Sequence, residues 1–277
     1  MSCLLILRAN AFSFLDDLRV YSPSVEDHVT HYREVLGRLQ MAGFAMNPEV
    51  NLGANEIKYL GHLLSSRGIK IIPDRIAAIQ RYTRPTNLRA LRTFIDMVGF
   101  YARFIPDYSR RAALLQGFKR KDVQFVWRSE HQAAFESLKQ ALREAPVLQI
   151  PDFGKEFVLV TDANDLAVSA VFHLRVDGEQ APISYYSRML TVAERRNSTY
   201  GKKRLAVIFG CEKFRTYFEN KEFEIHCDNM ALFWLLKRVK DVGGLGRWIL
   251  RLIPFKFSVK HTRGADNVVA DGLSRIF

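Results

Sequence analysis

Cysteine is scarce in this sequence: its 277 residues include only Cys3, Cys211 and Cys227. The odd count, with the last two cysteines in apolar runs, favours reduced, buried thiols over a disulfide framework. The three cysteines and seven histidines form no C-x-x-C pair and no H-x-x-x-H pattern, so we expect no structural zinc site. These features fit an intracellular protein.

Long apolar runs are also absent. No stretch approaches the roughly 20 apolar residues that span a bilayer. The first residues, MSCLLILRANAFSFL, resemble a signal peptide, but their apolar core, Leu4 to Leu7, is too short for one. We therefore expect a soluble chain in the cytoplasm or nucleus, with no membrane partner.

Acidic residues are in the minority. The chain has 29 Asp and Glu against 41 Lys and Arg, which gives a formal net charge of +12. A basic balance of this size favours nucleic acid or another anionic surface as the partner. A soluble basic protein without a polyanionic ligand is the alternative from charge alone.

What is present is a sequence of regular periodic segments. In the first half the patterns predict two short strands around an acidic turn in 12–21, a helix over 28–44 stopped by Gly43, and a hairpin over 57–71 that turns at Ser65 to Gly68. They then predict three helices. The first is short and opened by Pro73, the second is capped by Thr86 or Asn87 and runs to Pro106, and the third follows Ser129, where S-E-H-Q is a capping box.

From Phe157 the pattern changes to strands and then to alternating helices and strands. It predicts strands at 157–162, 167–175, 181–187, 223–228 and 255–261, and helices at 203–218, 231–239, 246–252 and 267–275, with a turn containing Asp177-Gly178. Such an order describes an α/β domain of about 120 residues. Its boundary is expected between Ala145 and Pro151.

Three aspartates in this second half stand where they could share one site. Asp162 and Asp228 each end a predicted strand, and Asp271 lies on the last predicted helix. Carboxylates at the ends of neighbouring strands meet at one edge of a sheet, and a cluster of them needs a cation to stay ionised. Two magnesium ions about 3.5–4 Å apart would serve phosphodiester hydrolysis. For each Asp alone, a cap or turn role is the alternative.

The sequence motifs around these aspartates are specific to one protein family. VTDANDLAVSAV, ISYYSRMLTVAE, KFRTYF, HCDNMAL and HTRGADNVVADGLSR occur in this order and resemble the ribonuclease H domain of gypsy-type LTR-retrotransposon polyproteins, over roughly 150–277. The resemblance implies a metal-dependent endonuclease that cuts the RNA strand of RNA–DNA hybrids with Mg²⁺ or Mn²⁺. It implies that Asp162, Asp228 and Asp271 bind metal, and that His261 matches a mobile histidine assisting product release. A surface histidine near a strand end is the alternative for His261.

The helix that should supply the fourth acid departs from the family pattern. The family usually has Y-S-x-x-E-K-E-x-L-A, whereas this chain has Y-G-K-K-R-L-A, with Gly201 and Lys203 in place of the two glutamates. Glu212 falls on the opposite helix face and Glu194 precedes the helix, so neither is expected to substitute. An ammonium about 4 Å from a divalent ion costs roughly 8 kcal/mol at an effective dielectric of about 20. We expect an impaired catalyst, in which Lys203 could pair with Asp162 or Asp228.

The N-terminal segments resemble a second part of the same polyproteins. FLDDLRVYS, HVTHYREVLGRLQMAGFAMNPE and YLGHLLSSRGI resemble the end of the reverse-transcriptase palm, which implies that Asp16 and Asp17 are carboxylates of a polymerase metal site. A solvated turn is the alternative for this pair. Residues 72–119 resemble the thumb and connection. Four arginines there are candidates for phosphate contacts, or for a solvated charged face: Arg75, Arg81, Arg89 and Arg92.

Polymerisation by this chain alone is not expected. The family's first metal-binding aspartate and its nucleotide-binding fingers lie well upstream of the hairpin, and residues 1–15 contain no Asp or Glu. The segment at 47–52 is also one residue shorter than the family pattern, which would shift a strand register unless a bulge absorbs it.

The sequence therefore predicts an α/β class protein in three segments: a partial reverse-transcriptase palm (1–72), a thumb/connection-like helical segment (73–148) and a ribonuclease H-like mixed sheet flanked by helices (149–277). Three hypotheses follow. The chain is a weak ribonuclease H, a non-catalytic module that binds nucleic acid, or the product of a decaying element copy. Protein abundance in cells would separate the third hypothesis from the others.

Overall fold

The computed structural model describes residues 11–14, 17–45, 53–120, 123–228 and 250–262, together with Phe233 and Trp248. The chain divides into two compact units, Met1–Ile57 and Lys58–Phe277. This division lies inside the segment 1–72 that the sequence assigns to the palm. Among the described helices, none is both long and apolar enough to cross a membrane.

The first unit contains a hairpin and a helix. Strands β1 (Ala11–Phe14) and β2 (Asp17–Val20) pair antiparallel, as the acidic turn between them predicts. Helix α1 (Val25–Met41) begins three residues before the predicted start at 28, because the Ser24 side chain accepts the backbone N–H of Asp27 at 3.0 Å. Gly43, with φ of 75°, follows the end of the helix and terminates it as expected.

Short strands and four helices follow. They are β3 (Glu56–Tyr59), β4 (His62–Ser65), β5 (Gly68–Ile71), α2 (Pro73–Gln80), α3 (Leu88–Phe100), the 3₁₀ turn η2 (Ala102–Phe104), α4 (Tyr108–Gly117) and α5 (Ser129–Arg143). The predicted hairpin is confirmed, since Ser65 pairs with Gly68 across the β4–β5 turn. α4 lies in a stretch for which the sequence predicts no element.

Helix α3 shows why the helical segment folds. The Asn87 side chain accepts the N–H of Ala90 at 2.9 Å and so caps the helix. One face of α3 is fully apolar and buried, at a spacing of three to four residues: Leu91, Phe94, Ile95 and Val98. The ring of Phe94 packs against that of Phe135 of α5, with ring centroids 4.4 Å apart and the ring planes tilted by 41°. Tyr185 of the next segment belongs to the same core, so helices and sheet are packed together.

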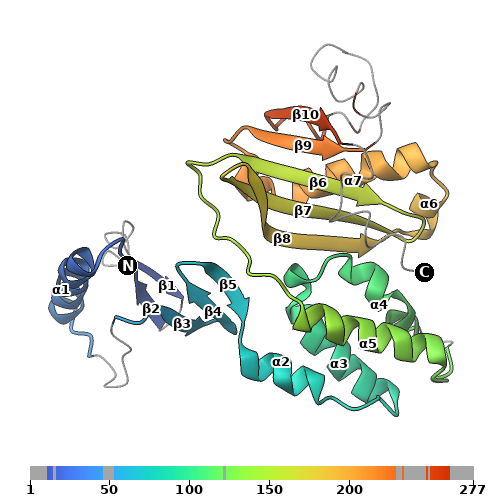
Figure 1. Ribbon diagram of the computed structural model, residues 1–277, viewed down its shortest axis with the longest axis horizontal. Helices are drawn as coiled ribbons and strands as arrows, with labels where there is room; N and C mark the ends of the chain where they lie inside the picture. Colours follow the sequence, from blue (N-terminus) through green and yellow to red (C-terminus); the bar gives the residue numbers. More distant parts are fainter. Residues whose placement is uncertain are drawn as a thin grey trace. The chain divides into compact units, whose positions relative to one another are not determined.

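The second half forms one five-stranded mixed sheet (Figure 1). Its strands are β6 (Phe157–Ala163), β7 (Ala167–Val176), β8 (Glu179–Met189), β9 (Phe223–Cys227) and β10 (Phe257–His261), in the order β10-β9-β6-β7-β8. β10, β9 and β6 are parallel to one another, and β7 and β8 are antiparallel to their neighbours. Asp177 and Gly178 both have positive φ in the two-residue turn between β7 and β8, as the sequence predicts.

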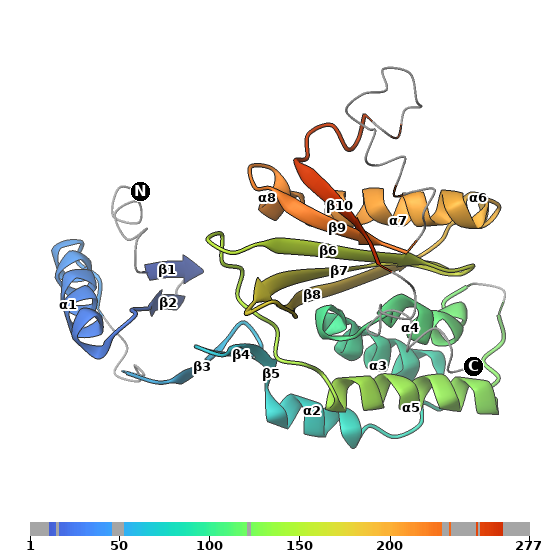
Figure 2. The same cartoon turned by 45° about the horizontal axis from the view of Figure 1, so that its top comes forward.

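Helices cover both faces of this sheet (Figure 2). On one face lie α6 (Val192–Arg195), α7 (Thr199–Lys213) and α8 (Arg215–Phe218); α7 and α8 enclose an aromatic core that includes Phe157, Phe172 and Phe218. Gly210 lets α7 approach the strands, because a Cβ there would lie 3.1 Å from that of Ala170. Helices α3 to α5 lie on the other side. The predicted α/β class is therefore confirmed.

Two helix predictions are wrong in detail, and three others are not tested. The predicted helix 203–218 begins at Thr199, because Ser198 caps it, and it is interrupted at Phe214. The capping box at Ser129 does not form; Arg128 is the cap, and its N–H donates to the His131 side chain at 3.0 Å. The predicted helices 231–239, apart from Phe233, and 267–275 lie outside the described residues, as do residues 246, 247 and 249 of the predicted helix 246–252.

Candidate functional site

Two of the predicted metal-binding acids lie at the same end of the sheet. β6 and β9 are parallel neighbours, and Val160 lies opposite His226. Asp162 is two residues beyond Val160, and Asp228 is two residues beyond His226. The shared register therefore brings both carboxylates to matching positions at the carboxyl ends of adjacent strands. The condition that the sequence set for a common site, neighbouring strands, is met.

Lys203 reaches this pair from α7. Because Ser198 accepts the N–H of Gly201 and starts the helix, Lys203 lies in the second turn, on the same face as Gly210, which packs on the sheet. Its Nζ donates to Oδ2 of Asp228, and both side chains are largely buried. An ammonium therefore stands beside the carboxylate that the family pattern assigns to metal.

The two glutamates nearest in sequence are bound elsewhere. Arg188 holds Glu194 with two hydrogen bonds of 2.7 and 2.8 Å, which, together with the Thr191 cap, lowers the pKa of this carboxyl to about 2. Glu212 accepts two hydrogen bonds from Arg251. Neither carboxylate lies with Asp162 and Asp228, so neither replaces the missing glutamate.

Asp162 lies in a poorly solvated position. Burial, with smaller contributions from the charges of Asp107 and Asp228, raises the pKa of its carboxyl to about 6. A backbone hydrogen bond at Ala163 and the ammonium of Lys203 act in the opposite direction. Desolvation of the Asp162 carboxylate thus outweighs the attraction of the Lys203 ammonium.

The other predicted site residues are more scattered. His261 ends β10, with its ring centroid 6.1 Å from that of Phe233. Asp17 is the first residue of β2, opposite Phe14, while Asp16 and Asp271 lie outside the described residues.

Residues 127–225 match the family described as the RNase H-like domain found in reverse transcriptase. Over 98% of its length the chain is 34% identical to the retrovirus-related Pol polyprotein from transposon 297 of Drosophila melanogaster, and over 97% it is 33% identical to that from transposon 412. Over 95% it is 32% identical to the transposon Tf2-3 polyprotein of Schizosaccharomyces pombe. The chain belongs with the LTR-retrotransposon polyproteins. It spans 25%, 22% and 20% of the length of these relatives.

Solved structures agree with the fold of this retrotransposon chain. The foamy viral protease-reverse transcriptase in complex with double-stranded DNA superimposes with a TM-score of 0.77 at 21% identity, covering 94% of this chain and 56% of that one. The same viral protein in complex with an RNA/DNA hybrid gives a TM-score of 0.78 at 20% identity, covering 94% and 36%. At this identity the likeness concerns the fold.

The retrotransposon pattern implies divalent metal, and the described part of the site does not fit it. Metal ligation needs Asp228 free to donate its oxygens, but Lys203 is bound to that carboxylate. Within the described ranges no group of three or more His, Cys, Asp or Glu side chains could hold a metal ion. The ammonium occupies the side of the site from which the family's glutamate would bind.

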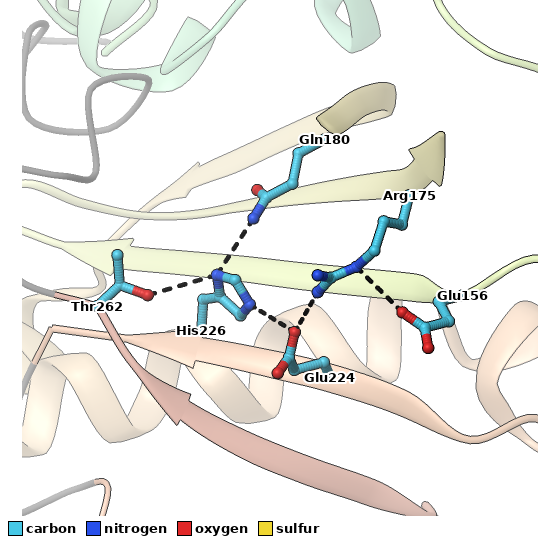
Figure 3. Close-up of polar contacts among 6 residues, drawn as sticks. All are labelled: Glu156, Arg175, Gln180, Glu224, His226 and Thr262. Carbon is cyan, nitrogen blue, oxygen red and sulfur yellow. Dashed lines mark hydrogen bonds and ion pairs between the residues drawn. The ribbon is translucent and has the colours of Figure 1, made fainter. Parts of the chain in front are cut away.

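Polar side chains around His226 of β9, two residues before Asp228, contact one another (Figure 3). His226 Nε2 lies 2.8 Å from Oε2 of Glu224, and Nδ1 lies 3.3 Å from Gln180 and 3.4 Å from Thr262. Arg175 binds Glu224 from β7. These side chains hydrogen-bond or ion-pair with one another, and these contacts stabilise β9, the strand that precedes Asp228.

The four predicted phosphate-binding arginines are all exposed on the helical segment. Arg75 lies in α2, Arg81 follows its end, and Arg89 and Arg92 lie on the face of α3 opposite its buried stripe. Their side chains are therefore accessible to a polyanion.

The sequence does not indicate that one charged residue, Asp107, lies near the site. Asp107 precedes α4, about 50 residues before the sheet begins, and the structure brings it beside Asp162. Only the packing of the helical segment on the sheet makes this neighbourhood, which no local spacing rule predicts.

Proposed function

We propose that this chain binds RNA–DNA hybrids through their phosphate backbone and leaves them uncut. The ion pair of Lys203 with Asp228 is the observation that carries this proposal. The chain has the sheet of a nuclease and, among its described residues, the acids Asp162 and Asp228, and it places an ammonium where a divalent ion would have to bind.

An ammonium cannot replace the chemistry of the metal. A divalent ion would polarise the phosphodiester, lower the pKa of a bound water and clamp the attacking and leaving oxygens. The Lys203 ammonium carries a single charge, has no vacant coordination position and is already hydrogen-bonded to Asp228. It can hold the site together by neutralising one carboxylate, so the fold persists without the catalyst.

Binding of nucleic acid is supported by charge and by the relatives. The net charge is +12, and the arginines of α2 and α3 are exposed. The structurally similar viral protein was solved in complexes with double-stranded DNA and with an RNA/DNA hybrid. We extend this ligand class to the present chain, with contacts to phosphates rather than base edges.

The expected result for the unaltered chain is strong, salt-dependent binding without cleavage. A fluorescently labelled hybrid should bind with a Kd that rises about tenfold or more between about 50 and 200 mM salt, because counterions are released from the contacted phosphates. In the same tubes the RNA should stay intact in Mg²⁺ and in Mn²⁺. Anisotropy and denaturing gels measure the two properties together.

Two results would argue against the proposal. A Kd independent of salt would exclude a backbone-binding surface. RNA cleavage by the unaltered chain that disappears in Asp228→Asn would show that three acids suffice and would favour a weak ribonuclease H instead.

A further inference from the structure

Arg103 lies in the 3₁₀ turn η2, shortly after the end of α3, and its side chain has no partner among the described residues. Its Nε is buried and lacks a hydrogen-bond acceptor. Within the described ranges the guanidinium also forms no ion pair. The residue is partly exposed, and its two terminal nitrogens are not enclosed. Arg103 therefore presents its terminal N–H groups to solvent while its Nε is surrounded by protein.

Other partly buried arginines of the chain are engaged. Arg111 donates to the hydroxyl of Ser137 at 2.7 Å, and Arg188 donates two hydrogen bonds to Glu194 at 2.7 and 2.8 Å. A buried N–H group without an acceptor costs free energy. Burial correspondingly lowers the pKa of the Arg103 guanidinium. An anion that accepted its terminal N–H groups would offset part of this cost.

The backbone on both sides of Arg103 is fixed by packing. Tyr101 is buried, and its hydroxyl donates to the carbonyl of Gly61 at 3.3 Å. Phe104 is fully buried, and its ring centroid lies 5.5 Å from that of His62 with the planes 20° apart. η2 also packs on β8. The base of the Arg103 side chain is thus held in place before any ligand binds, which reduces the entropy lost on binding.

Arg103 extends the exposed arginines of the helical segment to a second place. α3 has 13 residues and is therefore about 20 Å long. Arg89 and Arg92 lie near its start, whereas Arg103 follows its end. A planar guanidinium binds phosphate oxygens well because its N–H donors are paired in a fixed geometry. The chemistry of this position therefore favours a phosphate group.

Resting on the hybrid binding proposed above, we propose that Arg103 is a phosphate-contacting residue, which binds the backbone of the hybrid at the C-terminal end of α3. The guanidinium lacks a partner in the free chain and gains one in the complex. A contact of this kind holds the backbone in place and reads no base, so it is independent of nucleotide sequence.

The test is the salt dependence of the Kd of a labelled RNA–DNA hybrid for four chains: the unaltered chain, Arg103→Gln, Arg103→Lys and Arg215→Gln. Arg103→Lys keeps the charge and loses the paired donors. Arg215 is a matched control, because it is an exposed arginine that already pairs with Glu219 at 3.0 Å. Both Gln variants change the net charge by the same amount.

We expect Arg103→Gln to raise Kd about five- to tenfold at about 100 mM salt and to lower the slope of log affinity against log salt by about one, because one phosphate contact is lost. Arg103→Lys should keep the slope and raise Kd by only about two- to threefold. Arg215→Gln should bind like the unaltered chain.

Urea unfolding of the same chains separates this role from a structural one. Because the Arg103 guanidinium has no partner in the free chain, Arg103→Gln should unfold at the same or a higher urea concentration than the unaltered chain. An unchanged salt slope, or weaker binding together with a lower urea midpoint, would overturn the role of Arg103 while leaving the proposed function intact. Absence of binding by all four chains, with urea curves that show folded protein, would overturn both.

Discussion

Replacing Lys203 with glutamate is expected to turn a chain that leaves RNA–DNA hybrids intact into one that cuts them. The substitution removes an ammonium that costs up to about 8 kcal/mol beside a divalent ion at about 4 Å. It also supplies the carboxylate that the family pattern has at this position. Lys203 now binds Asp228, so its removal frees a second ligand as well.

The expected increase in the cleavage rate of Lys203→Glu can be judged from the effect of single electrostatic groups in other active sites. Removing one electrostatic element of an active site commonly changes the rate by 10² to 10³, so we expect cleavage to rise by about 10³-fold. Cleavage of labelled hybrid in Mg²⁺ measures it. Lys213→Glu makes the same charge change at the far end of α7 and should remain inactive. A Lys203→Glu chain that is folded, binds hybrid and still does not cut would contradict the account.

Replacing Asp162 with asparagine is expected to stabilise the fold at neutral pH. Burial raises the pKa of this carboxyl from 3.8 to about 6, so the folded chain holds the proton more tightly than the unfolded chain does. Stability then falls as pH rises from about 4 to about 6, and the loss persists above that range. The shift corresponds to at most about 3 kcal/mol, and partial solvation reduces the expected gain to about 1–2 kcal/mol.

Urea unfolding at pH 7.5 and pH 4.5 measures this gain. Asp162→Asn should be more stable than the unaltered chain at the higher pH and nearly equal to it at the lower pH, where Asp162 is protonated. Asp177→Asn, at an exposed turn, should show little change at either pH. Destabilisation of Asp162→Asn at pH 7.5 would mean that the Lys203 attraction outweighs burial.

The sequence predicted the features that depend on local residue spacing or on long sequence motifs. The apolar run at 157–162 and the segment 167–175 predicted β6 and β7. Asp177-Gly178 predicted the turn between β7 and β8, because only a few residue types adopt positive φ. The sequence motifs identified the RNase H-like family and aligned Lys203 with the position of the missing glutamate. The sequence also limited the partner of Lys203 to Asp162 or Asp228.

Other features depend on long-range packing and were beyond a local pattern. Helix α7 starts at Thr199 because the Ser198 side chain accepts one backbone N–H. Several polar residues nearby could have been the cap instead, and the sequence pattern does not choose among them. The charge of Asp107 acts on Asp162 through the packing of α4 on the sheet, where Ser109 donates two hydrogen bonds to Ser187. Sequence spacing contains no information about that contact.

Binding of Mn²⁺ tests the central claim, that a lysine has taken the place of the metal, most directly. Electron paramagnetic resonance of free Mn²⁺ during titration would compare the unaltered chain with Lys203→Glu. The account predicts no site in the unaltered chain at millimolar Mn²⁺, and in Lys203→Glu a site that an added Asp228→Asn substitution removes. An Mn²⁺ site in the unaltered chain that Asp228→Asn abolishes would contradict it.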